Sequence, residues 1–437
     1  MHIFEQVESN VRSYCRSFPV VFDRAKDEWL YTDSGDPYLD FFSGAGALNY
    51  GHNPSYLKEH LIEYVQSDGI VHGLDMYTRA KEAFLEAFVS GVLEPSGLHY
   101  KVQFCGATGT NAVEAALKLA RKVKGRNGIF SFMGGFHGMS LGSLSVTSNQ
   151  AHRAGAGMPL HDVTFFPYDD AAQLNGLDSM AYMEYVLTDS HSGVDKPAAV
   201  IFETIQAEGG IRVASAAWMQ RLRKLCDDHD ILLICDDIQV GCGRTGPFLS
   251  FERAGIVPDI VMLSKSISGY GLPMSMLLMK PELDIWKPGE HNGTFRGNQL
   301  AFITGKAALE WRKEVNLQAL TVHNETVIRE FLSHNIQSLH PDIEVRGMGM
   351  IWGIDLARLE GEDRYHVLTA SIAAACFEQG LVIERAGRNG SVLKIMPPLT
   401  IEKESLKQGL TMIESAITLV MNERSLPHLH PEPSINM

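Results

Sequence analysis

The chain has 437 residues, of which 45% are hydrophobic and 21% are charged, and its formal net charge is −14 at pH 7. This composition is ordinary for a globular protein of two or three domains, and the acidic charge disfavours nucleic acid and anionic membranes as partners. No apolar stretch approaches the roughly 20 residues that a membrane helix needs, and the N-terminus lacks the apolar core of a signal peptide.

The spacing of the cysteines and histidines indicates neither a disulfide framework nor a metal site. The six cysteines form no CxxC pair, which is typical of reduced thiols in the cytoplasm. The 17 histidines show no HExxH motif or other metal-ligand spacing. The sequence therefore predicts a soluble cytoplasmic protein that binds small molecules and holds no metal.

The first 55 residues are predicted to form a separate segment. A helical stretch ends at Pro19, a hairpin follows over residues 29–42, and the loop FFSGAGALNYGHNP leads to a helix that begins at Asn53-Pro54. Asn49 and Tyr50 in this loop are candidate substrate-binding residues. Taken alone, such a loop is more typical of a connector, because most glycine loops are turns.

From residue 56 to 305, helical patterns alternate with short apolar strands such as KVQFCG, GIFSFMGG, AAVIFETI, ILLICDD and DIVMLS. This alternation is typical of an α/β fold with an open, mostly parallel sheet and helices on both faces. A long helical pattern over 307–340 bridges to a smaller α+β domain, and the turn Asn389-Gly390 predicts a hairpin within it. We divide the chain into residues 1–55, which would pack with the small domain, a large domain of 56–305, a small domain of 306–424, and a disordered tail of 425–437.

Two of the predicted strands end in groups that can carry chemistry. ILLICDD ends in Asp236 and Asp237, and the strand DIVML is soon followed by Lys265. Because reactive groups gather beyond the carboxyl ends of parallel strands, these side chains could converge. A lysine beside fixed carboxylates suits pyridoxal phosphate (PLP), since the amine forms a Schiff base and a carboxylate keeps the pyridine nitrogen protonated. The pattern alone equally allows a lysine that simply reaches solvent.

The segment QFCGATGTN is a candidate phosphate site. A strand ends at Cys105, a glycine turn follows, and a helix is expected from about Asn111. The first amides of that helix, with the hydroxyls of Thr108 and Thr110, would form an anion cup. The GK[ST] ending of a nucleotide P-loop and the G-x-G-x-x-G spacing of a dinucleotide site are both missing from this segment, which favours a single phosphate.

Three further motifs carry candidate residues. GGFHG places Phe136 on a glycine-flanked turn, where it could lie against a planar ring or anchor the turn in the core. FETIQAEGG places Glu203 and Glu208 after a strand. Buried carboxylates there would need a basic partner, for which Lys394, Arg153 and Arg212 are the candidates. The polar loop EHNGTFRGN carries Thr294, which could donate to phosphate or belong to an ordinary surface loop.

The order of these motifs resembles the class III, ornithine aminotransferase-like family of PLP-dependent aminotransferases. The resemblance spans about residues 20–420 and is carried by TGTNAVEAALKLAR, GGFHG, FETIQAEGG, DDIQVGCGRTG, PDIVMLSKSI, GTFRGN and KIMPPLTI. Three stretches are closer still to the diaminobutyrate-forming members of the ectoine type: VESNVRSYCRSFPVVFDRA, DFFSGAGALNYGHN and SKSISGYGLPMSMLLMKPELDIWKPGEHNGTFRGN. The resemblance implies PLP as the cofactor and the PLP-dependent transferase fold type I.

The resemblance also implies roles for single residues. Lys265 would form the Schiff base and move the proton, Asp236 would bind the pyridine nitrogen, and Gln239 would bind the ring hydroxyl. The remaining cofactor-binding residues would be Gly109 and Thr110 at the phosphate, Phe136 on the ring, and Thr294 at the phosphate of the neighbouring subunit. The family's site therefore requires at least a homodimer, and a homotetramer is left open. Glu208 would pair with a mobile basic residue near the substrate.

The sequence departs from the family at the substrate end. Lys394 stands where many relatives carry the arginine that binds a substrate carboxylate, and lysine cannot grip a carboxylate bidentately. Met139 likewise replaces a second arginine of the ornithine enzyme, and Asp237 replaces a common glutamate. We expect Glu208 and Lys394 to form a pair that opens for one substrate and closes for the other.

The implied reaction is a ping-pong transamination. L-Glutamate would leave its amine on the cofactor, and L-aspartate 4-semialdehyde would take that amine at its aldehyde carbon. The alternatives are another ω-aminotransferase acting on ornithine, GABA or putrescine, a PLP aminomutase or decarboxylase of the same fold, and a non-catalytic relative that binds the cofactor.

Overall fold

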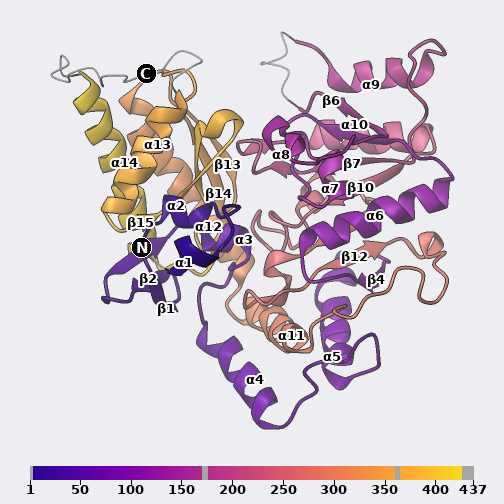
Figure 1. Cartoon of the computed structure of the whole chain (residues 1–437), viewed down its shortest axis with the longest axis horizontal. Coiled ribbons are helices and arrows are strands. Elements are labelled where there is room, and N and C mark those ends of the chain that lie inside the picture. The colour runs from indigo at the N-terminus through magenta and orange to yellow at the C-terminus, as the bar shows by residue number, and fades with distance from the viewer. Residues whose placement is uncertain (1–2, 170–175, 360–364, 426–437) are drawn as a thin grey trace.

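The computed structural model describes residues 3–169, 176–359 and 365–425. Figure 1 shows two bodies side by side, a large sheet with its helices on the right and a smaller sheet with α13 and α14 on the left. The predicted tail, from residue 426 onward, lies outside the described residues. In the part of the chain that is described, no helix is long and apolar enough to cross a membrane.

The large sheet has seven strands in the order β4-β12-β11-β10-β7-β5-β6. All neighbouring pairs are parallel except the two that involve β12, so β12 alone runs against the others. This confirms the predicted mostly parallel sheet and the α/β fold. The strands are β4 (Lys101–Phe104), β5 (Ile129–Phe132), β6 (Val163–Phe166), β7 (Ala199–Glu203), β10 (Leu232–Asp236), β11 (Ile260–Leu263) and β12 (Met276–Met279).

Helices cover both faces of this sheet, as the alternation along β10 shows. Leu233 and Cys235 pack in one hydrophobic cluster with residues of α5 (Arg79–Phe88) and α10 (Ala216–Asp228). Leu232 and Ile234 point the other way and pack with α6 (Gly109–Lys124). Because both faces are covered, every residue of β10 is buried, which explains its continuous apolar sequence.

The second body is built on the antiparallel sheet β13-β14-β17-β16, with the bounds Glu344–Met348, Ile351–Asp355, Val392–Ile395 and Glu384–Ala386. The hairpin predicted at Asn389-Gly390 joins β16 to β17. Helices α12 (Leu317–Phe331), α13 (Tyr365–Glu378) and α14 (Lys403–Ser425) contribute to its core. Helix α11 (Gln299–Glu314) links the two bodies and contacts α4 and α5.

The N-terminal segment is joined to the C-terminal half through a third sheet. Its strands β1 (Phe22–Lys26), β2 (Trp29–Thr32) and β3 (Pro37–Asp40) form a meander, and β3 pairs in parallel with β15 (Leu381–Val382). The short elements include α1 (Ile3–Val7), α2 (Tyr14–Ser17), α3 (Ser43–Gly46), α4 (Ser55–Gln66), α7 (Leu141–Val146), α8 (Gln150–Ala154), α9 (Ser179–Thr188), β8 (Ile205–Gln206) and β9 (Arg212–Val213). The N-terminal segment, joined to the C-terminal half by the pairing of β3 with β15, also carries Tyr14 of α2 close to Glu384 of β16.

Candidate active site

Lys265 and Asp236 meet at the carboxyl edge of the large sheet. Strands β10 and β11 are parallel neighbours, with Asp236 in register with Met262. Lys265 follows the end of β11 and begins a 3₁₀ turn, with its backbone in the left-handed region at φ 50°. A lysine pays a steric penalty in this conformation, so the surrounding packing must hold it there. Burial lowers the pKa of Lys265 to about 8, which favours an amine that can act as a nucleophile.

Asp236 is held by a histidine that the sequence analysis did not single out. His137 Nδ1 lies 2.7 Å from Asp236 Oδ2, and both side chains are buried. The Ile238 amide donates to Asp236 Oδ1 over 3.2 Å. These contacts fix the orientation of the carboxylate. The signal in the sequence was the position of His137 directly after Phe136 on the turn between β5 and α7.

Asp237 faces the opposite way. Its carboxylate accepts hydrogen bonds from the Ser250 amide at 3.0 Å and from the Ser250 hydroxyl, and it has no exposed surface. Burial raises the pKa of Asp237 to about 7. Its contacts give it a structural role.

The predicted phosphate cup is the N-terminus of α6. The helix begins at Gly109, directly after the extended residue Thr108, so the first amides have no acceptor within the helix. A Cβ atom at Gly109 would lie only 2.9 Å from the Ile238 side chain, so a larger residue would require that side chain to move. The Thr110 hydroxyl lies 2.8 Å from the Ser140 hydroxyl and 2.5 Å from that of Ser143. The cup is therefore a compact set of amide and hydroxyl groups.

Most of the predicted cofactor residues line one cavity of about 180 Å³. Its walls include Gly109, Thr110, Phe136, Asp236, Gln239 and Lys265, together with Glu203 and His137. The cavity thus offers an amine, a carboxylate, an aromatic face and a helix N-terminus. This donor set fits an aldehyde-bearing pyridine with a phosphate group, which is the chemistry of PLP.

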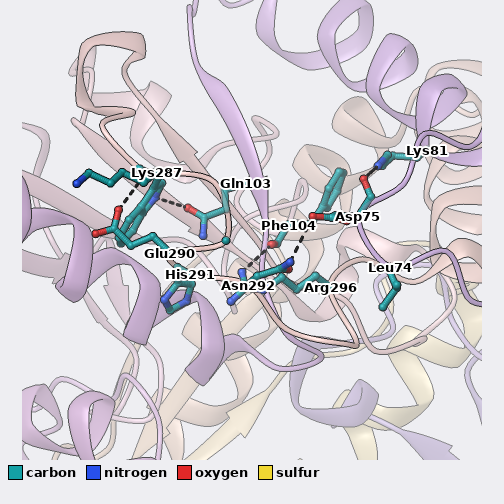
Figure 2. A pocket seen from close by; sticks show the side chains of 12 residues that line it. Leu74, Asp75, Lys81, Gln103, Phe104, Lys287, Glu290, His291, Asn292 and Arg296 are labelled. Atoms are coloured by element: carbon teal, nitrogen blue, oxygen red, sulfur yellow. Dashed lines mark hydrogen bonds between the residues drawn. The ribbon is translucent and has the colours of Figure 1, made fainter.

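Thr294 does not line this cavity. It is exposed on the loop between η4 (Pro281–Leu283) and α11, beside Phe295, which is 71% exposed. Figure 2 shows how this loop lies over a second cavity of about 250 Å³, with Asn292 reaching Asp75 and Arg296 reaching the Phe104 carbonyl. Within one chain, the loop therefore presents Thr294 outward.

Asn49 and Tyr50 are both engaged within the fold. Asn49 donates to the Cys242 carbonyl over 3.2 Å and accepts from Arg244 over 2.6 Å. The Tyr50 ring is buried and packs 5.8 Å from Trp311. Neither is among the residues that line the 180 Å³ cavity, although the backbone amide of Asn49 donates to the hydroxyl of Ser266, the neighbour of Lys265, over 3.1 Å.

Glu208 and Lys394 do meet, and a third charge joins them. The fully buried Lys394 Nζ lies 2.6 Å from Glu208 Oε1 and 2.7 Å from Glu384 Oε2. Gln239 Nε2 donates to Glu208 over 3.1 Å, which links this cluster to the cavity. Burial opposes the charge on Glu208, but Lys394 and Lys265 outweigh it and lower the pKa of Glu208 to about 2.

Glu384 was missed because it lies in no recognisable motif. It faces Lys394 across the β16–β17 hairpin, where the two residues are direct partners in the register. Once the turn at Asn389-Gly390 is placed, counting back along the hairpin from Lys394 finds Glu384, so a signal was present. Burial raises the pKa of Glu384 above its usual range, against the effect of Lys394.

Known proteins match this chain over nearly its whole length. A family model described as aminotransferase class-III covers residues 11–417. A diaminobutyrate–2-oxoglutarate transaminase from Bordetella parapertussis is 53% identical over 97% of this chain and 96% of that protein. The protein of the same name from Vibrio cholerae is 53% identical over 95% of this chain and 100% of its own length. Among solved structures, an ornithine aminotransferase from Toxoplasma gondii superposes with a TM-score of 0.82 at 26% identity, covering 96% of this chain and 94% of that one.

Proposed function

This chain belongs to the class III aminotransferase family, and we propose that it transfers the amino group of L-glutamate to the aldehyde carbon of L-aspartate 4-semialdehyde. The products are L-2,4-diaminobutyrate and 2-oxoglutarate. The observation that carries this proposal is the 53% identity to diaminobutyrate–2-oxoglutarate transaminases over nearly the full length of both chains. The cavity around Lys265 and Asp236 supplies the groups that the chemistry requires.

The cofactor is PLP, which draws electrons away from the carbon that bears the amine and so makes a C–H bond there acidic. We propose that Lys265 Nζ holds the cofactor covalently and moves the proton at the substrate carbon. Asp236, oriented by His137, would bind the pyridine nitrogen. Phe136 would lie against the ring, and the first amides of α6 at Gly109 and Thr110 would hold the phosphate.

Gln239 constrains how the ring hydroxyl can be bound. Its amide nitrogen already donates to Glu208 over 3.1 Å and to the Ala45 carbonyl over 2.9 Å. A contact with the cofactor hydroxyl would therefore use the amide oxygen as an acceptor. Gln239 would then connect the cofactor hydroxyl to Glu208, with one end of its amide at each.

We further propose that the working unit is a homodimer at least. Thr294 of each subunit would reach the cofactor phosphate of the other, and the outward position of its loop supports this arrangement. We also propose a cytoplasmic location and a place in ectoine-type synthesis, both on the basis of the sequence pattern.

Absorbance of the holoenzyme tests the reaction directly. Titration with diaminobutyrate, glutamate, ornithine and GABA should convert the PLP form most efficiently with the first two, and each conversion should release its oxo product in equal amount. Faster conversion by ornithine or GABA than by diaminobutyrate would make the chain a different ω-aminotransferase. Product without a matching oxo acid would indicate an aminomutase.

A further inference from the structure

The cluster around Lys394 holds more negative than positive charge. Its ammonium faces two carboxylates, Glu208 at 2.6 Å and Glu384 at 2.7 Å. One carboxylate would suffice to neutralise a buried lysine, so the second needs a separate reason, because burying excess charge is costly. The next cation toward the cavity is Lys265, which the cofactor occupies in the proposed function. The cluster is therefore suited to receive a further positive group.

The cluster extends outward from the cofactor cavity. Gln239 lines the cavity and donates to Glu208, Glu208 contacts Lys394, and Lys394 contacts Glu384. At the outer end, the Tyr14 hydroxyl lies close enough to Glu384 for that carboxylate to add to the effect of partial burial in raising the Tyr14 pKa, and Tyr14 is 53% exposed. A substrate whose reacting nitrogen lies at Lys265 would extend along this row, with its far end near Glu384 and Tyr14.

The two amine donors differ in one respect at this far end. Counted from the reacting nitrogen, diaminobutyrate and glutamate both carry a carboxylate after the same number of carbons. Diaminobutyrate adds an ammonium group on the third carbon, whereas glutamate adds a carboxylate on the first. A site that distinguishes them therefore needs an anion beside the third carbon, away from the reacting nitrogen.

We propose that Glu384 is the specificity-determining residue that binds the unreactive α-ammonium group of diaminobutyrate, with the Tyr14 hydroxyl orienting its carboxylate. This inference rests on the proposed function and adds the group that tells diaminobutyrate from amines that lack this charge. A hydrogen bond between an ammonium and a buried carboxylate is charge-assisted and strong. Lys394 keeps the carboxylate in place across the hairpin until the substrate arrives.

The matched probe is 4-aminobutyrate, which is diaminobutyrate without its α-ammonium group. The experiment measures kcat/KM for both amines by single-turnover loss of the PLP absorbance in the full-length holoenzyme. Glu384→Gln keeps the shape of the side chain and removes its charge. The ratio of diaminobutyrate to 4-aminobutyrate should fall roughly 10- to 100-fold, with the loss confined to diaminobutyrate.

Two further variants control for damage to the fold. Glu344→Gln removes a carboxylate from β13 of the same sheet and should leave the ratio unchanged. Tyr14→Phe should lower the ratio in the same direction by a smaller factor, roughly two- to tenfold. If Glu384→Gln does not fold, the Tyr14→Phe ratio decides the matter.

An unchanged ratio in the folded variant, or an equal loss with both amines, would overturn the proposal, because Glu384 would then act only through Lys394. A wild-type ratio near one would overturn it as well, while leaving transamination of diaminobutyrate intact. Failure of the proposed function looks different, since the wild-type enzyme would then not convert diaminobutyrate at all.

Discussion

Two groups of carboxylates flank the candidate active site, one buried and one partly buried, and they are stabilised in different ways. On the large sheet, Asp236 contacts His137, and Glu203 accepts a backbone hydrogen bond from Phe136 over 3.1 Å. Burial and the nearby Asp236 raise the pKa of Glu203 well above its usual range. At the substrate end, Glu208, which lies between β8 and β9, and Glu384, on β16 of the small sheet, instead face the full charge of Lys394.

This difference matches the task of each region. A cofactor ring presents the same charges in every turnover, so a fixed set of dipoles, a histidine and a carboxylate can hold it. The substrates alternate in charge, and a set of mobile ion pairs can respond to that alternation. Substitutions on the large sheet should therefore weaken both half-reactions alike, whereas those on the small sheet should separate them.

Loss of the lysine should have the largest effect. Lys265→Ala removes the group that moves the proton, so both half-reactions should slow by roughly 10²- to 10⁴-fold. Single-turnover absorbance with diaminobutyrate and with glutamate measures each rate. Lys58→Ala, on the exposed face of α4, is the matched control and should react normally. Wild-type rates in Lys265→Ala would remove this residue from the mechanism.

The next largest effect should come from Asp236→Asn. The amide cannot stabilise a protonated pyridine nitrogen, so both rates should fall by roughly 10²- to 10³-fold. His137→Phe should act in the same direction but less strongly, since it removes only the 2.7 Å contact that orients Asp236. Stopped-flow rates for both substrates check this, and a loss restricted to one substrate would break the comparison between the two regions.

Lys394→Ala should separate the half-reactions. Without the ammonium group, no cation remains in this cluster for the glutamate carboxylate, so the glutamate half should lose roughly 10- to 100-fold more than the diaminobutyrate half. The variant should also be less stable, by at most about 3–5 kcal/mol, because two partly buried carboxylates lose their partner. Thermal unfolding of the holoenzyme measures that loss. Equal losses in both halves would contradict a switch built on Glu208 and Lys394.

The same comparison explains what could be predicted from the sequence. Asp236, Lys265 and Gly109 follow strands of a parallel sheet, and such a sheet places the ends of its strands along one edge. Short motifs in fixed order therefore predicted most of the cofactor cavity. His137 was missed because its role depends on reaching Asp236, 99 positions away in the chain.

The substrate end was harder to predict because it depends on long-range pairing. Glu384 can be identified as the partner of Lys394 only from the β16–β17 register. Tyr14 lies near it in an N-terminal segment that is joined to the C-terminal half by the pairing of β3 with β15. Asn49 lay in a promising loop, yet its amide is used by Arg244 and Cys242. The role proposed for Thr294 depends on a second chain, and the domain boundaries at 55 and 305 stay predictions.

The smallest expected effect concerns pH and sharpens the description of the large-sheet region. Lys265 must lose its proton before it can attack the cofactor aldehyde, and burial lowers its pKa to about 8 from the usual 10.5. The free amine increases as pH rises through that value, so covalent capture of PLP by the apoenzyme should speed up about tenfold between pH 7 and 9 and then level off. Absorbance after rapid mixing gives the rate at each pH. A rise that continues past pH 10 would mean an ordinary, solvated lysine. The contrast between a fixed, buried cofactor region and a charge-paired substrate region would then fail at Lys265.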